Sequence, residues 1–203
     1  MAALFPMFVK LAGRKCVIVG GGKVAESKIE ALLLSGAEVY VVAPEASRQG
    51  ANLASEGKLR WKQKSFRPSD LKGIALVIAA TDFRDVNEMV FRVAERLGIL
   101  CNSVDQPDQC HFYYPAVVRR GALQIAISTS GLSPSLAHRL RVELEAQFGP
   151  EYEAYLEWLD AVRRAVFSKH ADRTRRQRLL ERFAGRTMQS TFEAHRQSRR
   201  EQR

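Results

Sequence analysis

Short apolar runs alternate with amphipathic stretches through the first half of the chain, and this alternation predicts its fold. Four runs have the length of buried strands: 16–19, 39–43, 74–80 and 99–104. Between them, apolar residues recur at helical spacing from about Lys23 to Gly36, and again over 46–56 and 82–97. Residues 59–66 alternate apolar and charged residues in their first half, which is typical of an edge strand. Strands that alternate with helices in this way predict a doubly wound α/β sheet.

The pattern changes beyond Pro107. Two short apolar segments, 111–118 and 123–128, flank the turn residues Arg119 to Gly121 and predict a small antiparallel ribbon. Ser133 followed by Pro134 is typical of a helix start, so a helix is expected over 135–148. Two further amphipathic segments, 152–167 and 175–183, predict more helices.

The stretch that joins the first strand to the first helix has the spacing G-x-G-x-x-A, formed by Gly20, Gly22 and Ala25. Gly20 would allow the tight turn, Gly22 would let the backbone approach a pyrophosphate, and Ala25 would let the helix pack close to the sheet. The pyrophosphate would then lie on the free N–H groups and the positive dipole end of the helix that begins near Lys23. This context favours a nucleotide site on a Rossmann-type sheet over a merely structural turn.

Other candidate residues follow the remaining strands. Ligands of such sheets bind at the carboxyl ends of the strands, so residues from all these ends are expected to share one edge. Besides the glycine turn, the cofactor-binding candidates at this edge are Pro44, Glu45, Thr81, Asp82 and Asn102.

The residues after the second strand favour NAD as the dinucleotide. An acidic residue about 20 residues beyond the glycine turn usually holds the ribose hydroxyls. Here Ala43 and Pro44 occupy that point, and Glu45 follows one step later. The first arginine that could receive a 2′-phosphate is Arg48, so the acidic position is displaced, and NAD is preferred to NADP.

The net charge of +10 is concentrated in the tail. Residues 1–162 carry a net charge of +1, whereas residues 163–203 carry +9. Such a segment could bind a polyanion such as RNA, an anionic membrane or a polycarboxylate substrate. A solvated helix face with a frayed end past about Arg186 is the simpler interpretation. No apolar run approaches the ~18 residues of a membrane span, and no secretory leader is recognised, so a cytoplasmic location is expected.

Cysteine and histidine spacing predicts no metal centre. Cys16, Cys101 and Cys110 form no C-x-x-C pair, which argues against a zinc site and against a disulfide framework. His111 and His138 could ligate Fe²⁺ weakly, but isolated histidines are more often structural.

Several strings of the chain resemble the precorrin-2 dehydrogenase family, the NAD-dependent module of sirohaem synthesis. The matching strings are PMFVKL, VIVGGGKVAESK, VVAPE, IAATD followed by VN, CNSVDQP and FYYPAVVRRGALQIAISTSGLSP. The resemblance runs from about Phe5 to Pro150. It implies the oxidation of precorrin-2 to sirohydrochlorin with hydride passed to NAD, and for some members also the insertion of Fe²⁺.

The resemblance also implies roles for individual residues. The family's aspartate, proposed as general base and as chelatase residue, matches Asp105. The residues alone favour a simpler role, in which Asp105 shapes a turn with Gln106 and Pro107. The family's NAD contacts match Lys23, Val24, Pro44 and Glu45. Candidate contacts to the carboxylate-rich tetrapyrrole are Arg119, Arg120, Arg139, Thr129 and Ser130, and Arg141 lies beside them. Thr129 stands where some members carry a phosphorylatable serine.

We therefore expect three parts and a homodimer. The parts are an NAD-binding Rossmann domain (1–114), a dimerisation hairpin and helix (115–149) and a helical C-terminal domain with a basic tail (150–203). The expected partners are the tetrapyrrole and a second copy, with neither membrane nor nucleic acid. The alternative is an NAD(H)-binding regulator that uses its basic tail on nucleic acid, although no helix-turn-helix pattern is found.

Overall fold

The computed structural model describes residues 4–104 and 106–184 and divides into two compact units, Met1–Tyr114 and Pro115–Arg203. The candidate base Asp105 and the tail predicted to fray past Arg186 lie outside the described residues.

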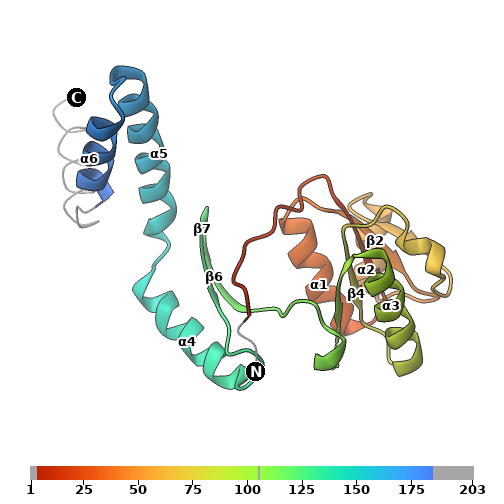
Figure 1. Cartoon of the computed structure of the whole chain (residues 1–203). Coiled ribbons are helices and arrows are strands. Elements are labelled where there is room, and N and C mark those ends of the chain that lie inside the picture. Colours follow the sequence, from red (N-terminus) through yellow and green to blue (C-terminus); the bar gives the residue numbers. More distant parts are fainter. Residues whose placement is uncertain (1–3, 105, 185–203) are drawn as a thin grey trace. The chain divides into compact units, whose positions relative to one another are not determined.

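The first unit is a five-stranded parallel sheet flanked by helices (Figure 1). Its strands are β1 (Lys15–Val19), β2 (Glu38–Val42), β3 (Arg60–Lys62), β4 (Leu76–Ala79) and β5 (Leu100–Ser103), in the order β3-β2-β1-β4-β5. Helices α1 (Lys23–Leu34), α2 (Arg48–Ser55) and α3 (Arg84–Leu97) connect them, with two short 3-10 turns, η1 (Pro68–Leu71) and η2 (Pro107–Gln109). The predicted doubly wound α/β fold is confirmed.

Two apolar clusters hold the sheet between its helices. On one face, Ile18 and Ile78 pack with Ile29 and Leu32 of α1. On the other face, Val17 and Val77 pack with Val90 and Val93 of α3. Each fully buried aliphatic side chain contributes about 1.5–3 kcal/mol, so the central strands β1 and β4, apolar on both faces, anchor the fold.

The chain leaves β1 and β4 toward opposite faces of the sheet. Helix α1 follows β1 and covers one face, whereas α3 follows β4 and covers the other. The carboxyl ends of these neighbouring strands therefore form the topological switch point, where open α/β sheets bind their ligands.

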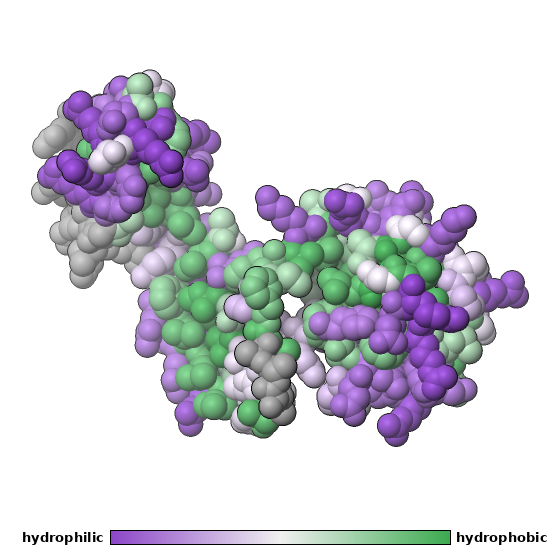
Figure 2. All heavy atoms as spheres, viewed as in Figure 1, coloured by the Kyte–Doolittle hydropathy of each residue, from purple (hydrophilic) through white to green (hydrophobic). Residues whose placement is uncertain are grey.

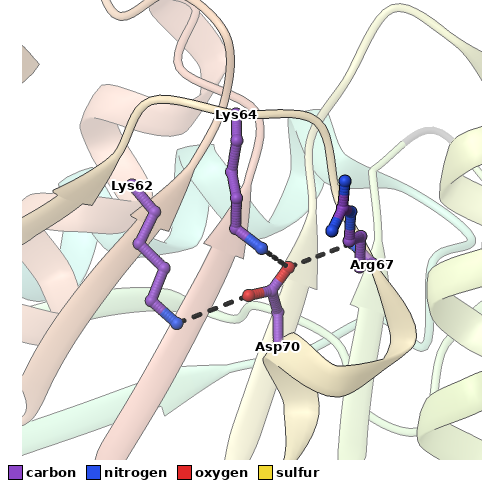
Figure 3. Close-up of polar contacts among 4 residues, drawn as sticks. All are labelled: Lys62, Lys64, Arg67 and Asp70. Carbon is purple, nitrogen blue, oxygen red and sulfur yellow. Dashed lines mark hydrogen bonds and ion pairs between the residues drawn. The ribbon is translucent and has the colours of Figure 1, made fainter.

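Buried Asp70 ties η1 to the edge strand (Figure 3). Its carboxylate accepts hydrogen bonds from Lys64 Nζ at 2.8 Å, Lys62 Nζ at 3.4 Å and the Arg67 backbone N–H at 3.0 Å. Burial by itself would raise the pKa of Asp70, but the Lys64, Arg67 and Lys62 contacts outweigh it and lower the pKa. The contacts on this carboxylate thus stabilise its charged form.

We expect Asp70→Asn to destabilise the protein at neutral pH and to flatten its acid response. A carboxylate whose pKa is lowered by folding stabilises the folded state above its ordinary pKa, and that contribution is lost as the pH falls through the folded value. Because both lysines are partly exposed, the expected loss is only about 1–2 kcal/mol at pH 7, and little difference should remain near pH 3. Urea unfolding at both pH values measures this. Glu56→Gln removes an exposed partner of Lys58 and should change the free energy of unfolding little. Equal losses of stability in the two variants would contradict a stabilising role of Asp70.

The described part of the second unit contains a β-ribbon and three helices. Strands β6 (Ala116–Arg120) and β7 (Leu123–Ile127) pair antiparallel, as predicted, and are followed by α4 (Pro134–Gln147), α5 (Glu151–Lys169) and α6 (Arg173–Ala184). The Ser133 hydroxyl caps α4 by accepting from the Leu136 N–H at 3.2 Å. Tyr155 stacks on Trp158, which meets Phe183 edge to face, and these rings join α5 to α6. In the part of the chain that the structure describes, no helix is both long enough and apolar enough to span a bilayer.

Candidate nucleotide site

Gly20 forms the turn out of β1 in a conformation that suits glycine alone. Its φ is +116°, and a β-carbon there would lie 2.2 Å from the carbonyl oxygen of Ala80. The turn therefore packs directly on the end of β4, at the switch point of the sheet.

Gly21 brings the loop after β2 against the same turn. A β-carbon on Gly21 would lie 2.3 Å from the Glu45 carbonyl oxygen, and the Ser47 N–H donates to the Gly21 carbonyl at 2.7 Å. Glu45 is thus held beside the glycine turn. The glycine spacing assigns no role to Gly21; its contact with the loop after β2 becomes visible only in three dimensions.

Gly22 leaves an open cradle at the start of α1. A β-carbon there would meet no atom within 4 Å. Gly22 is the N-cap residue and offers no side-chain cap, and within the described residues no acceptor binds the N–H groups of Lys23 or Val24. Open space, free donors and the positive helix end fit an anionic pyrophosphate. Ala25, fully buried, lets α1 pack close to the sheet.

The loop after β4 is shaped by Asn87, a residue that the sequence analysis did not select. The Asn87 Oδ1 accepts from the Thr81 hydroxyl at 2.7 Å and from the Thr81 N–H at 3.2 Å, while its amide donates to the Thr81 carbonyl at 2.9 Å. Asn87 is buried inside α3, so it fixes the backbone of Thr81 at the ligand edge and leaves Asp82 exposed beside it. An asparagine among the apolar residues at the start of an amphipathic helix is the sequence signal that could have indicated this role.

Asn102 uses its side chain within the fold. Its amide donates to the Phe112 carbonyl at 2.9 Å and to the Cys110 sulfur at 3.4 Å, so it holds the segment that returns beneath β5. Pro44, by contrast, is exposed next to Glu45.

The cysteines and histidines considered as metal ligands do not form a metal site. Cys16 and Cys101 are buried, His111 is hydrogen-bonded within the fold, and His138 belongs to the second unit. Burial raises the pKa of Cys16 to about 11 and that of Cys101 to about 12, so both thiols stay protonated at neutral pH. The His111 Nδ1 accepts from the Cys101 N–H at 3.1 Å, whereas His138 is exposed on α4. Within the described ranges, no group of three or more such side chains could hold a metal ion.

In the second unit, the candidate substrate residues differ in how far the fold already uses them. The Arg120 guanidinium donates to the carbonyls of Phe148, Glu145 and Arg119, which closes the end of α4. Arg139 pairs with Glu143 at an exposed site, and Arg141 pairs with Glu145. The Thr129 hydroxyl accepts from the Ser133 N–H at 3.1 Å; Ser130 has a φ of 53°. Arg119 is exposed. Substrate contacts by this set stay predictions.

Comparison with known proteins agrees with this geometry. The family model described as "Putative NAD(P)-binding" matches residues 7–116, and the model described as "Sirohaem biosynthesis protein central" matches residues 120–147. Siroheme synthase 3 of Aeromonas hydrophila is 39% identical over 180 residues, which cover 89% of this chain and 38% of that protein. Siroheme synthase of Neisseria meningitidis serogroup B is 41% identical over 183 residues, covering 90% of this chain and 38% of that protein.

The solved structure titled "SirC, precorrin-2 dehydrogenase" has a TM-score of 0.77 and 30% sequence identity, and the match covers 88% of each chain. The present chain spans 38% of the length of the two siroheme synthases named above.

The parallel sheet with an open glycine cradle at its switch point defines a dinucleotide-binding protein of the Rossmann class. More particularly, the chain belongs to the precorrin-2 dehydrogenase family of sirohaem biosynthesis proteins. The predicted family and the predicted dinucleotide cofactor are confirmed, and NAD is the dinucleotide that the likeness to precorrin-2 dehydrogenase supports.

Proposed function

We propose that this protein oxidises precorrin-2 to sirohydrochlorin with NAD as the acceptor. The observation that carries the proposal is the likeness to a precorrin-2 dehydrogenase over 88% of both chains, combined with an open cradle in the glycine turn. NAD, when bound, supplies the site for the hydride that leaves the macrocycle. The remaining chemistry belongs to the protein: it must hold the dinucleotide, orient the macrocycle and accept a proton.

The pyrophosphate is assigned to Gly22 and to the N–H groups of Lys23 and Val24. Glu45, pressed beside the turn by its backbone contact with Gly21, is assigned to the ribose hydroxyls. A carboxylate at this point attracts hydroxyl donors and repels a 2′-phosphate, which supports NAD over NADP. Thr81 and Asp82 border the other side of the switch point.

We assign Asp105 as the base that accepts the proton from the oxidised macrocycle. Loss of a hydride leaves a cationic macrocycle, which reaches the neutral product when a base removes a proton, so atoms and electrons balance as NADH and one H⁺. In the sequence, Asp105 comes two residues after Ser103, the last residue of β5, and a carboxylate is a suitable base for this proton.

Incubation with precorrin-2 and NAD, followed by absorption spectroscopy, tests the proposal. Conversion to sirohydrochlorin with one NADH formed per macrocycle supports it, and an unchanged spectrum with intact substrate would contradict it. A second arm with Fe²⁺ asks whether the protein also accelerates metal insertion, as some members of the family do. The alternative of a nucleic-acid-binding regulator depends on the basic tail, and no observation on the described residues favours it.

We further propose that the protein is a homodimer joined through its second unit. Apolar side chains are exposed on α4 and in the loop that precedes it, and Figure 2 shows apolar residues gathered over this part of the molecule. Leu132 is 77% exposed and Val142 is also exposed. A small ribbon followed by one helix offers little surface to bury such residues, and a second copy could cover them. A cytoplasmic location stays a prediction.

Sedimentation at micromolar concentration is expected to give a dimer, and Leu132→Glu is expected to shift it toward the monomer. A charge placed in an apolar interface loses its hydration without gaining a partner. Leu34 offers a matched control, because it is exposed to the same 77% but lies on α1 in the first unit. Leu34→Glu should remain dimeric. A wild-type monomer, or equal effects of the two substitutions, would contradict this interface.

A further inference from the structure

Three buried side-chain oxygens after β5 have no hydrogen-bond partner. They are the Ser103 Oγ, the Gln106 Oε1 and the Gln109 Oε1, and among the described residues no donor or acceptor reaches any of them. Ser103 is only 1% exposed. Buried polar groups are nearly always paired, since an unpaired one has lost water without compensation. Three such groups in one short segment indicate a site that a polar ligand completes.

The backbone around these side chains is closed into a compact turn. The single proton of the Cys110 thiol is shared between the Ser103 carbonyl, at 3.2 Å, and the Gln106 carbonyl, at 3.3 Å. The Gln109 N–H donates to the Gln106 carbonyl at 2.9 Å. Burial raises the pKa of Cys110, so its thiol remains a donor at neutral pH. The three side chains are therefore attached to a segment whose ends are fixed to each other.

This turn lies on the side of the switch point opposite to Glu45. Ser103 is the last residue of β5 and pairs in register with Ala79, the last residue of β4. Gly20 packs on Ala80, which directly follows β4. Glu45 follows β2, which lies on the other side of β1 from β4. A dinucleotide with its adenosine near Glu45 and its pyrophosphate on Gly22 has its nicotinamide half toward β4 and β5.

We propose that Ser103, Gln106 and Gln109 bind the carboxamide of the nicotinamide ring. The carboxamide NH₂ has two N–H donors for the two glutamine oxygens, and the Ser103 hydroxyl can either donate to the carboxamide oxygen or accept from its nitrogen. Acceptor oxygens suit an amide and would repel the carboxylates of the tetrapyrrole. The assignment rests on the dinucleotide site of the proposed function and adds residues that fix the ring that receives the hydride.

Calorimetric titration with three probes tests this inference without measuring turnover. NAD carries the carboxamide, 3-acetylpyridine adenine dinucleotide replaces its NH₂ by a methyl group, and ADP-ribose lacks the ring. Wild-type protein is expected to bind NAD about tenfold more tightly than the acetylpyridine analogue, because the analogue leaves the glutamine oxygens unpaired. In Gln106→Leu and Gln109→Leu this preference should fall to about threefold or less, with ADP-ribose affinity unchanged.

The controls separate the possible failures. Gln63→Leu makes the same change at an exposed position of the same unit and should keep the full preference. Ser103→Ala, which removes only the hydroxyl, should weaken NAD but not ADP-ribose. Retained ADP-ribose binding in each variant reports an intact fold. A preference for NAD that survives in all three variants, or that is absent in the wild type, overturns the inference. Failure of wild-type protein to bind even ADP-ribose would instead overturn the dinucleotide site itself.

Discussion

Replacing Gly22 by valine is expected to abolish NAD binding while the protein remains folded. The Gly22 φ of −78° is accessible to any residue, and a β-carbon there meets no protein atom within 4 Å. The valine side chain would stand at the N-cap of α1, beside the free N–H groups of Lys23 and Val24. We expect NAD affinity to fall by at least about 100-fold, because the pyrophosphate would lose its contact with the helix end. Calorimetric titration together with urea unfolding measures both quantities.

Two other glycines separate binding from folding. Gly50 lies in α2 with room for a β-carbon, since its nearest neighbours would be 3.6 Å and 3.7 Å away. Gly50→Ala should bind NAD normally and gain up to about 1 kcal/mol from helix propensity. Gly20→Ala should instead destabilise the protein by about 3 kcal/mol or more, because its β-carbon clashes with the Ala80 carbonyl and its φ is positive. Unchanged NAD affinity in Gly22→Val would refute the phosphate cradle.

The sheet was predictable because its strands are apolar on both faces and its helices on one. Such periodicity survives in sequence, and the strands β1, β2, β4 and β5 fall within a residue or two of the predicted runs. The edge strand was less accurate: residues 59–66 were predicted, but β3 covers only Arg60–Lys62. Beyond Lys62 the chain turns into η1, which is held by the buried carboxylate of Asp70. Single contacts between residues six and eight positions apart leave no periodic signal.

The candidate site divides in the same way. The glycine spacing indicated the cradle because each glycine has a local backbone duty. Gly21, Asn87 and the turn closed by Cys110 depend instead on contacts with other strands, loops or helices. Likewise, sequence alone presented Arg119 and Arg120 as equivalent, whereas the fold uses the Arg120 guanidinium to bind the carbonyls at the end of α4. Which arginine stays exposed is decided by packing.

Replacing Asp105 by asparagine is expected to lower dehydrogenase turnover by about 10²-fold to 10⁴-fold, the usual contribution of a general base. Asparagine keeps the shape and much of the hydrogen bonding of aspartate but cannot take the proton that the oxidised macrocycle releases. NAD affinity should hardly change, because the cradle at Gly22 follows β1, whereas Asp105 follows β5 in the sequence. Single-turnover formation of NADH with saturating precorrin-2 measures the step directly.

Asp108 provides the matched control for this substitution. It is an exposed aspartate of η2, three residues further along the sequence. Asp108→Asn removes the same charge from the same region, so a general electrostatic effect would slow both variants alike, whereas a base at Asp105 slows only one. In the Fe²⁺ arm, a carboxylate that also accepts pyrrole protons would make Asp105→Asn slow in metal insertion as well. Wild-type dehydrogenase rates in Asp105→Asn would remove the base assignment, and Fe²⁺ insertion no faster than without protein would confine the enzyme to dehydrogenation.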